Sequence, residues 1–65
     1  MKGWHFVKGV DHYWVGAPDA EAAKRALREH DFRGVAETEP VAIPSAVVDF
    51  FKLRPDMVIT GRVFL

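Results

Sequence analysis

The sequence predicts an α+β fold in which residues 1–65 form a single domain with the element order β-β-α-α-β. Two runs of aromatic and β-branched residues open the chain, an amphipathic helical segment follows at 18–30, and an alternating run closes the chain. Such a mixture of strand and helix periods is typical of an α+β architecture. We therefore expect a three-stranded, mainly antiparallel sheet with two helices packed on one face.

The first two runs, 3–8 and 10–17, are expected to form a β-hairpin. In the first run, Trp4 and Phe6 fall on one face of the strand and the residues between them on the other. Gly9 between the runs tolerates the positive φ of a tight turn. In the second run, Tyr13 and Val15 compete with Trp14 for the core face, so the phase of this strand stays open.

The segment 18–30, PDAEAAKRALREH, carries helix signals at its start, along its body and at its end. Pro18 suits the first helical position, where its missing N–H leaves no hydrogen bond unmade. Acidic residues in the first turn and basic residues nearer the end favour the helix macrodipole. An apolar stripe is expected along Ala20, Ala23, Ala26 and Leu27, with His30 continuing its line. Gly34 is well placed to stop the chain.

The second half of the chain is expected to add a helix and a last strand. Residues 35–40 are a polar connection, and 41–43 is a short apolar run whose extended form Pro44 favours. A helix then starts at Pro44, with Val47, Phe50 and Phe51 at apolar i, i+3, i+4 spacing and Val48 and Leu53 widening that face. Arg54-Pro55 is expected to end it. The run 57–65 alternates as expected for a strand, and we expect this strand to join the hairpin. Its apolar side consists of Met57, Ile59, Val63 and Leu65. Gly61 lies on the same side and marks a bulge or a close contact.

Length and composition bound the possible functions. A 65-residue chain buries only about 60% of the surface that its unfolded form exposes, so it is marginally stable alone. With 49% hydrophobic residues the chain is globular, and with no cysteine it has neither disulfides nor thiolate metal sites. We expect a homo-oligomer or a subunit of a larger complex. The start of the chain does not resemble a signal peptide, and no apolar run has membrane-spanning length, so we expect a cytoplasmic protein without membrane contact.

The charge pattern disfavours nucleic acid as the main partner. Nine basic residues balance nine acidic ones, and neither end forms a basic tail, whereas a nucleic-acid binder usually shows a basic patch. Folding can still gather a basic cluster on one side. Its members would be Lys24, Arg25, Arg28 and Arg33.

No catalytic motif or metal-ligand pattern is present, so we expect neither an enzyme nor a cofactor. The only serine, Ser45, falls in the first turn of a predicted helix, and Glu37 and Glu39 lie in a polar loop. His5 and His12 flank the hairpin turn and can approach one another across the strands. A zinc or nickel site would need two or more further ligands, for which Asp11 is the only nearby candidate. We therefore expect no metal site.

The most unusual feature of the chain is a cluster of aromatic residues near its start, Trp4, Phe6, Tyr13 and Trp14. Most of these rings are expected to fill the core, but Tyr13 and Trp14 are adjacent in a strand and cannot both point inward. At least one should lie on an open sheet face, where Trp and Tyr are favoured anchors of protein interfaces. The leading hypothesis is a small non-catalytic interaction module that binds a partner protein or itself. Its expected contact residues are Trp4, His5, His12, Tyr13 and Trp14.

Residues 41–59, VAIPSAVVDFFKLRPDMVI, support an alternative. The matching positions are Ile43-Pro44, Val47, Phe51, Leu53, Arg54-Pro55 and Ile59. In these the segment resembles half of an AbrB-type swapped-hairpin element, with an Ile-Pro entry into a short helix and a basic-Pro turn into a strand. Asp56 and Met57 stand where that family has Gly-Asp, and the preceding ETEP is acidic. The resemblance implies an intertwined dimer, and the alternative function is a dimeric DNA-binding regulator of the antitoxin kind.

Overall fold

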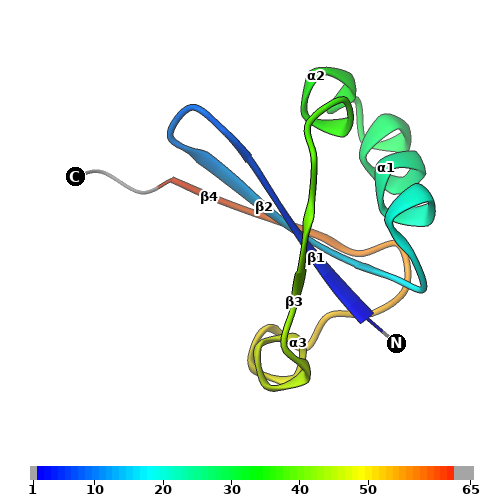
Figure 1. The fold of residues 1–65 in the computed structure, drawn as a ribbon, viewed down its shortest axis with the longest axis vertical. Helices are drawn as coiled ribbons and strands as arrows, with labels where there is room; N and C mark the ends of the chain where they lie inside the picture. The colour runs from blue at the N-terminus through cyan, green and yellow to red at the C-terminus, as the bar shows by residue number, and fades with distance from the viewer. Residues whose placement is uncertain (1, 63–65) are drawn as a thin grey trace.

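The computed structural model describes residues 2–62. This part contains four strands and three helices (Figure 1), in the order β1 (Lys2–Lys8), β2 (Asp11–Ala17), α1 (Ala20–Glu29), α2 (Arg33–Ala36), β3 (Val41–Ile43), α3 (Ser45–Phe51) and β4 (Val58–Arg62). The strands form one sheet in the order β3-β1-β2-β4, with all neighbours antiparallel. The predicted α+β class is confirmed, and the hairpin and the pairing of the last strand with it are confirmed too.

The sheet has one strand more than predicted. The run 41–43 was expected to be extended, and in the structure it pairs with residues 3–5 of β1 as an edge strand. A three-residue strand has too few positions to show an alternating pattern, so its pairing with the distant β1 could not be read from the sequence. The polar connection expected at 35–40 is also partly wrong, because Val35 and Ala36 are buried in the short helix α2.

The two faces of the sheet are covered by different helices. Directly opposite residues share a face, so the pairs Trp4–Val15 and Phe6–Tyr13 place these four side chains on the face covered by α1 and α2. Trp14 alternates to the other face, where its ring lies 5.0 Å from that of Phe51 in α3. Figure 1 shows α3 well separated from α1 and α2. The expectation that all helices share one face is therefore wrong, and the phase of β2 is settled.

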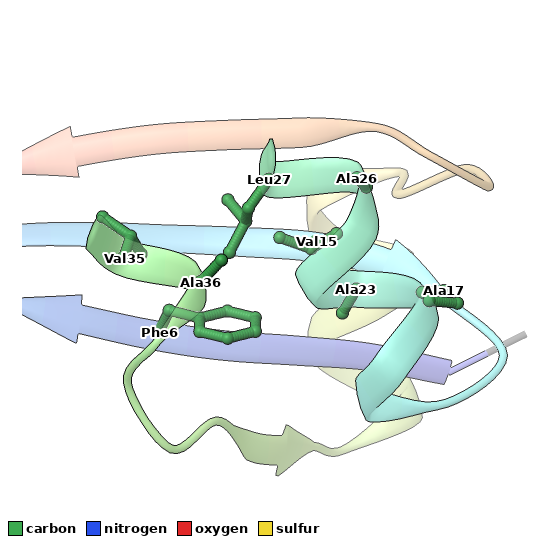
Figure 2. Packing of buried hydrophobic residues seen from close by; sticks show 9 residues of the cluster. Phe6, Val15, Ala17, Ala23, Ala26, Leu27, Val35 and Ala36 are labelled. Atoms are coloured by element: carbon green, nitrogen blue, oxygen red, sulfur yellow. The ribbon is translucent and has the colours of Figure 1, made fainter. Parts of the chain in front are cut away.

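The core lies between the sheet and α1 with α2 (Figure 2). Its largest fully buried side chains are Phe6, Val15 and Leu27, and most of the remaining members are alanines. Because alanine adds little width, the helix backbone can lie close to the strands, which gives a compact but small core. Trp4 and Tyr13 pack at its margin.

The ends of α1 differ from the predicted ones. Pro18 does not take the first helical position: Asp19 is the N-cap, and its Oδ1 accepts a 2.8 Å hydrogen bond from the backbone N–H of Ala22. At the other end Asp31 adopts a left-handed φ of 67°, which asparagine and aspartate tolerate better than most residues. Gly34 therefore does not stop the helix but lies inside α2.

The predicted apolar stripe of α1 is correct for three of its residues. Ala23, Ala26 and Leu27 are buried, but Ala22 takes the place expected for Ala20, and His30 is exposed. At about 100° per residue the four buried residues fall in one arc of the helix, Ala20 lies at the edge of that arc, and His30 is the C-cap beyond the last turn.

Helix α3 begins one residue later than predicted, since Pro44 is its extended N-cap, and it ends earlier. Lys52 closes it in a left-handed conformation with φ 53°, before Arg54-Pro55. Val48 and Leu53 are buried, whereas Phe50 is 80% exposed instead of facing the core. The strand predicted over 57–65 is observed as β4, which begins at Val58 and therefore leaves Met57 outside it, and positions 63–65 lie outside the described residues.

The segment that follows α3 is fastened to the end of β2 at Gly16. The Gly16 N–H donates to the Met57 carbonyl (3.0 Å), and the Gly16 carbonyl accepts from the Asp56 N–H (2.9 Å). A Cβ added at Gly16 would collide with the backbone carbonyl of Arg54. A side chain is therefore excluded at this position by the close approach of two backbones.

We expect Gly16→Ala to lower the free energy of unfolding by about 1–3 kcal/mol, because the added methyl group must push the backbone of Arg54 away. Gly34→Ala is the matched control: its added Cβ meets only the flexible end of Lys8, and alanine favours a helix. Urea denaturation of both variants checks this. Equal stability of the Gly16→Ala variant and the parent would show that the junction is looser than described.

Candidate functional site

The sheet face opposite α1 carries a continuous row of rings. Ring centroids lie 5.3 Å apart for His5 and Trp14, 5.8 Å for His12 and Trp14, 5.0 Å for Trp14 and Phe51, and 5.4 Å for Phe51 and Phe50. The histidines and Trp14 come from the hairpin and the two phenylalanines from α3. Centroid distances in this range are those of interacting aromatic pairs. We call this surface the aromatic face; it consists of His5, Val7, His12, Trp14, Val41, Phe50 and Phe51.

The aromatic face is open to solvent along much of its length. Phe50 is 80% exposed, Val41 65% and Val7 42%. The register places Val41 opposite His5 and Val7 opposite His12, so these two valines flank the histidines. Helix α3 thus covers only one end of this face, and large apolar side chains remain uncovered beyond it.

In the described strands, the aromatic face has no Lys, Arg, Asp or Glu. A charge on these strand residues could come only from protonation of His5 or His12. By the register of the described strands, the charged side chains Lys2, Lys8, Asp11 and Arg62 all belong to the opposite face. A solvated sheet face normally carries polar and charged residues. The arrangement is reversed here, because the face with charged residues is the one covered by two helices.

His5 and His12 meet edge to edge on this face. Nε2 of His5 and Nδ1 of His12 share a 2.8 Å hydrogen bond, in which one nitrogen holds the proton and the other accepts. Their planes are within 14° of parallel, but the centroids are 5.0 Å apart. The centroid separation exceeds the nitrogen separation by about two ring radii, so the rings point at one another in one plane rather than stacking. Such in-plane geometry is the one that directs a lone pair at a proton.

The surroundings of His5 favour its neutral form. Partial burial lowers the pKa of His5 below its usual value of 6.5, and the nearby His12 lowers it further. The hydrogen bond itself needs an unprotonated acceptor, so protonating both rings would replace it with repulsion between two cations.

The structure divides the five residues predicted to contact a partner between the two faces. His5, His12 and Trp14 lie together on the aromatic face. Trp4 and Tyr13 lie on the opposite face, where the Trp4 indole N–H donates to the Ala17 carbonyl (3.2 Å) and Tyr13 packs on Phe32 with ring centroids 5.0 Å apart.

The predicted basic cluster is spread along the outside of the helices. Lys24, Arg25 and Arg28 belong to α1 and Arg33 begins α2, and apart from the half-buried Lys24 these residues are exposed. The acidic residues Glu21, Glu29 and Asp31 are interspersed among them. The outer surface of α1 therefore carries charges of both signs.

Asp11, expected as the nearest additional metal ligand, lies on the other face from the histidines. Its Oδ1 accepts a 2.7 Å hydrogen bond from Nε of Arg62. This ion pair borders a hollow of about 260 Å³, whose lining also includes Tyr13, Phe32 and Thr60. The two charged groups there are paired with each other. Among residues 2–62 no group of three or more His, Asp or Glu side chains is arranged to hold a metal ion.

Sequence reasoning missed the α3 part of the aromatic face. Apolar i, i+3, i+4 spacing ordinarily marks a core, so it predicts that Phe50 and Phe51 share one buried helix face. In a seven-residue helix that spacing cannot distinguish a buried side from an exposed one. Val41 was missed because its strand was not placed in the sheet.

Comparisons with protein-family models, with curated proteins and with solved structures found no match to this chain. Within residues 2–62 no helix is long and apolar enough to cross a membrane.

We expect the free energy of unfolding to decrease as the pH falls below about 6.5. Because the pKa of His5 is lower in the folded than in the unfolded chain, the unfolded state binds more protons between these two pKa values. The contribution of His5 to the free energy of unfolding is therefore fully present above pH 6.5 and is lost as the pH falls toward the pKa of His5 in the folded chain. Urea denaturation between pH 7.5 and pH 5, in the presence of a chelator, measures this.

The decrease should be smaller in a His5→Gln variant and should persist in a His30→Gln variant, since His30 lies outside the pair at the end of α1. An unchanged pH dependence in His5→Gln would contradict the assignment.

Proposed function

We propose that the protein is a small non-catalytic interaction module that associates with a second copy of itself through the aromatic face. The observation that supports this most is the uncharged and incompletely covered strand surface of that face, extended by the exposed Phe50. Contiguous exposed apolar surface on a small protein marks an interaction site. Tryptophan at the centre of such a surface is a typical interface anchor.

A second copy suits this surface for electrostatic reasons. In a twofold dimer each surface patch meets its own equivalent, so a charged patch would oppose like charges. Here the residues of the described strands that would meet include no Lys, Arg, Asp or Glu, and the chain as a whole has a formal net charge of zero. Two copies can therefore approach without net repulsion.

The small core gives self-association an energetic benefit. Among residues 2–62 only Phe6, Val15 and Leu27 are large and fully buried, and the chain has no cysteine to supply a disulfide. Domains of this size commonly gain stability by oligomerisation. Burying Phe50, Val41 and Val7 against a second copy would add apolar burial at roughly 25 cal/mol per Å², opposed by the entropy lost on association.

We expect sedimentation equilibrium of the parent protein to show a concentration-dependent dimer, and Phe50→Asp and Val41→Lys to shift the equilibrium to monomer. Both side chains are mostly exposed in one copy. At high dilution, where the protein is monomeric, the free energy of unfolding of each variant should therefore differ from that of the parent by no more than about 0.5 kcal/mol. Arg25→Asp, an exposed charge change on α1, is the matched control and should dimerise like the parent.

A parent that stays monomeric at millimolar concentration would contradict the proposal, as would a dimer weakened by Arg25→Asp but not by Phe50→Asp. A mixed-sequence DNA duplex is titrated in parallel. Binding that weakens steeply with added salt, and that is lost in Arg25→Asp, would favour the DNA-binding alternative instead.

A further inference from the structure

We propose that His5 and His12 form a bidentate site for a divalent transition-metal ion that prefers right-angle coordination, such as Cu²⁺. This goes beyond the proposed function and does not rest on it, since both ligands belong to one copy of the chain. The sequence alone led us to expect no metal, because no third protein ligand is near. The geometry of the pair now supports a labile two-ligand site whose remaining positions are filled by water.

The spacing of the two nitrogens fits such an ion. Metal–imidazole bonds are about 2.0–2.1 Å long, so two ligands at a right angle lie about 2.9 Å apart and two tetrahedral ligands about 3.3–3.4 Å apart. Nε2 of His5 and Nδ1 of His12 are 2.8 Å apart. This spacing matches the square-planar or tetragonal geometry that Cu²⁺ and Ni²⁺ adopt with imidazole ligands.

The two nitrogens can be converted from a hydrogen bond to a chelate by a shift of one proton and a rotation of each ring. They already face one another in nearly parallel planes. When the shared proton moves to the outer nitrogen of its ring and leaves the bridge, both inner nitrogens have a lone pair. Each ring then has to turn by about 45° so that both lone pairs point to one position beside the line that joins the nitrogens, because two equal metal bonds at a right angle each make that angle with the line. The rigid hairpin holds the two Cα positions while this happens.

The surroundings favour an ion at this position. Metal ions bind neutral imidazole, and the hydrogen bond between the two inner nitrogens requires that at least one of them is unprotonated. In the strand register the face around the pair is made of Val7, Val41, Trp14 and Gly61. No carboxylate or cation of the described strands shares this face, so none of these competes for the ligands or repels the ion. A divalent ion here would add charge to the centre of the aromatic face.

The test is a titration of untagged protein with CuCl₂, followed by isothermal calorimetry and by fluorescence. In a Trp4→Phe variant the only indole is Trp14, whose ring centroid lies 5.3 Å from His5, so bound Cu²⁺ should quench its emission. In a Trp14→Phe variant the remaining Trp4 lies on the opposite face and should stay bright. We expect one ion per chain. His5→Gln and His12→Gln should each weaken binding at least about tenfold, because a chelate becomes a single ligand.

His30→Gln is the matched control, and Cu²⁺ should bind it as tightly as the parent. Repeating the titration in the Phe50→Asp background separates this proposal from self-association, because a monomeric variant that still binds one ion supports the metal site alone. Three results would overturn it: no saturable binding, equal affinity in the His5→Gln and His12→Gln variants and the parent, or loss of binding in His30→Gln.

Discussion

The fold depends on the pleat of β2, which sends two adjacent aromatic side chains to opposite faces of the sheet. Tyr13 and Val15 point toward α1 and α2, and Trp14 points away from them. Because side chains alternate along a strand, this single choice of phase determines where every neighbour on β1 and β4 must lie. It places Phe6 in the core and brings the histidines together beside Trp14.

Because of this constraint, the few large apolar side chains of the chain are divided between the two faces of the sheet. The α1 side receives the fully buried side chains, and Gly3 and Gly16 on the other side let α3 and the turn after it approach the strands. Helix α3 has only seven residues, so it cannot cover the whole second face. The uncovered part is apolar and aromatic, which is why we propose self-association there. The edge-to-edge histidines lie within the same surface, so binding of a cation there would change the affinity of this surface for a second copy.

The strongly patterned elements of this fold could be predicted from the sequence, and those set by distant contacts could not. The hairpin with its turn at Gly9, the body of α1 and the start of α3 follow from local residue chemistry. The pairing of 41–43 with β1 and the position of α3 depend on contacts between segments about 40 residues apart along the chain. For the candidate site, the approach of His5 and His12 across the hairpin was foreseen. Their 2.8 Å spacing depends on register and rotamers, which no residue pattern encodes.

The most direct test of the two-faced sheet is a nuclear Overhauser spectrum of the aromatic side chains at low protein concentration. Trp14 should show contacts to Phe51 and to the ring protons of His5, and Tyr13 should show contacts to Phe32. No contact is expected between Trp14 and Leu27. A strong Trp14–Leu27 contact would mean that β2 has the opposite phase, and it would remove the aromatic face together with both proposals built on it.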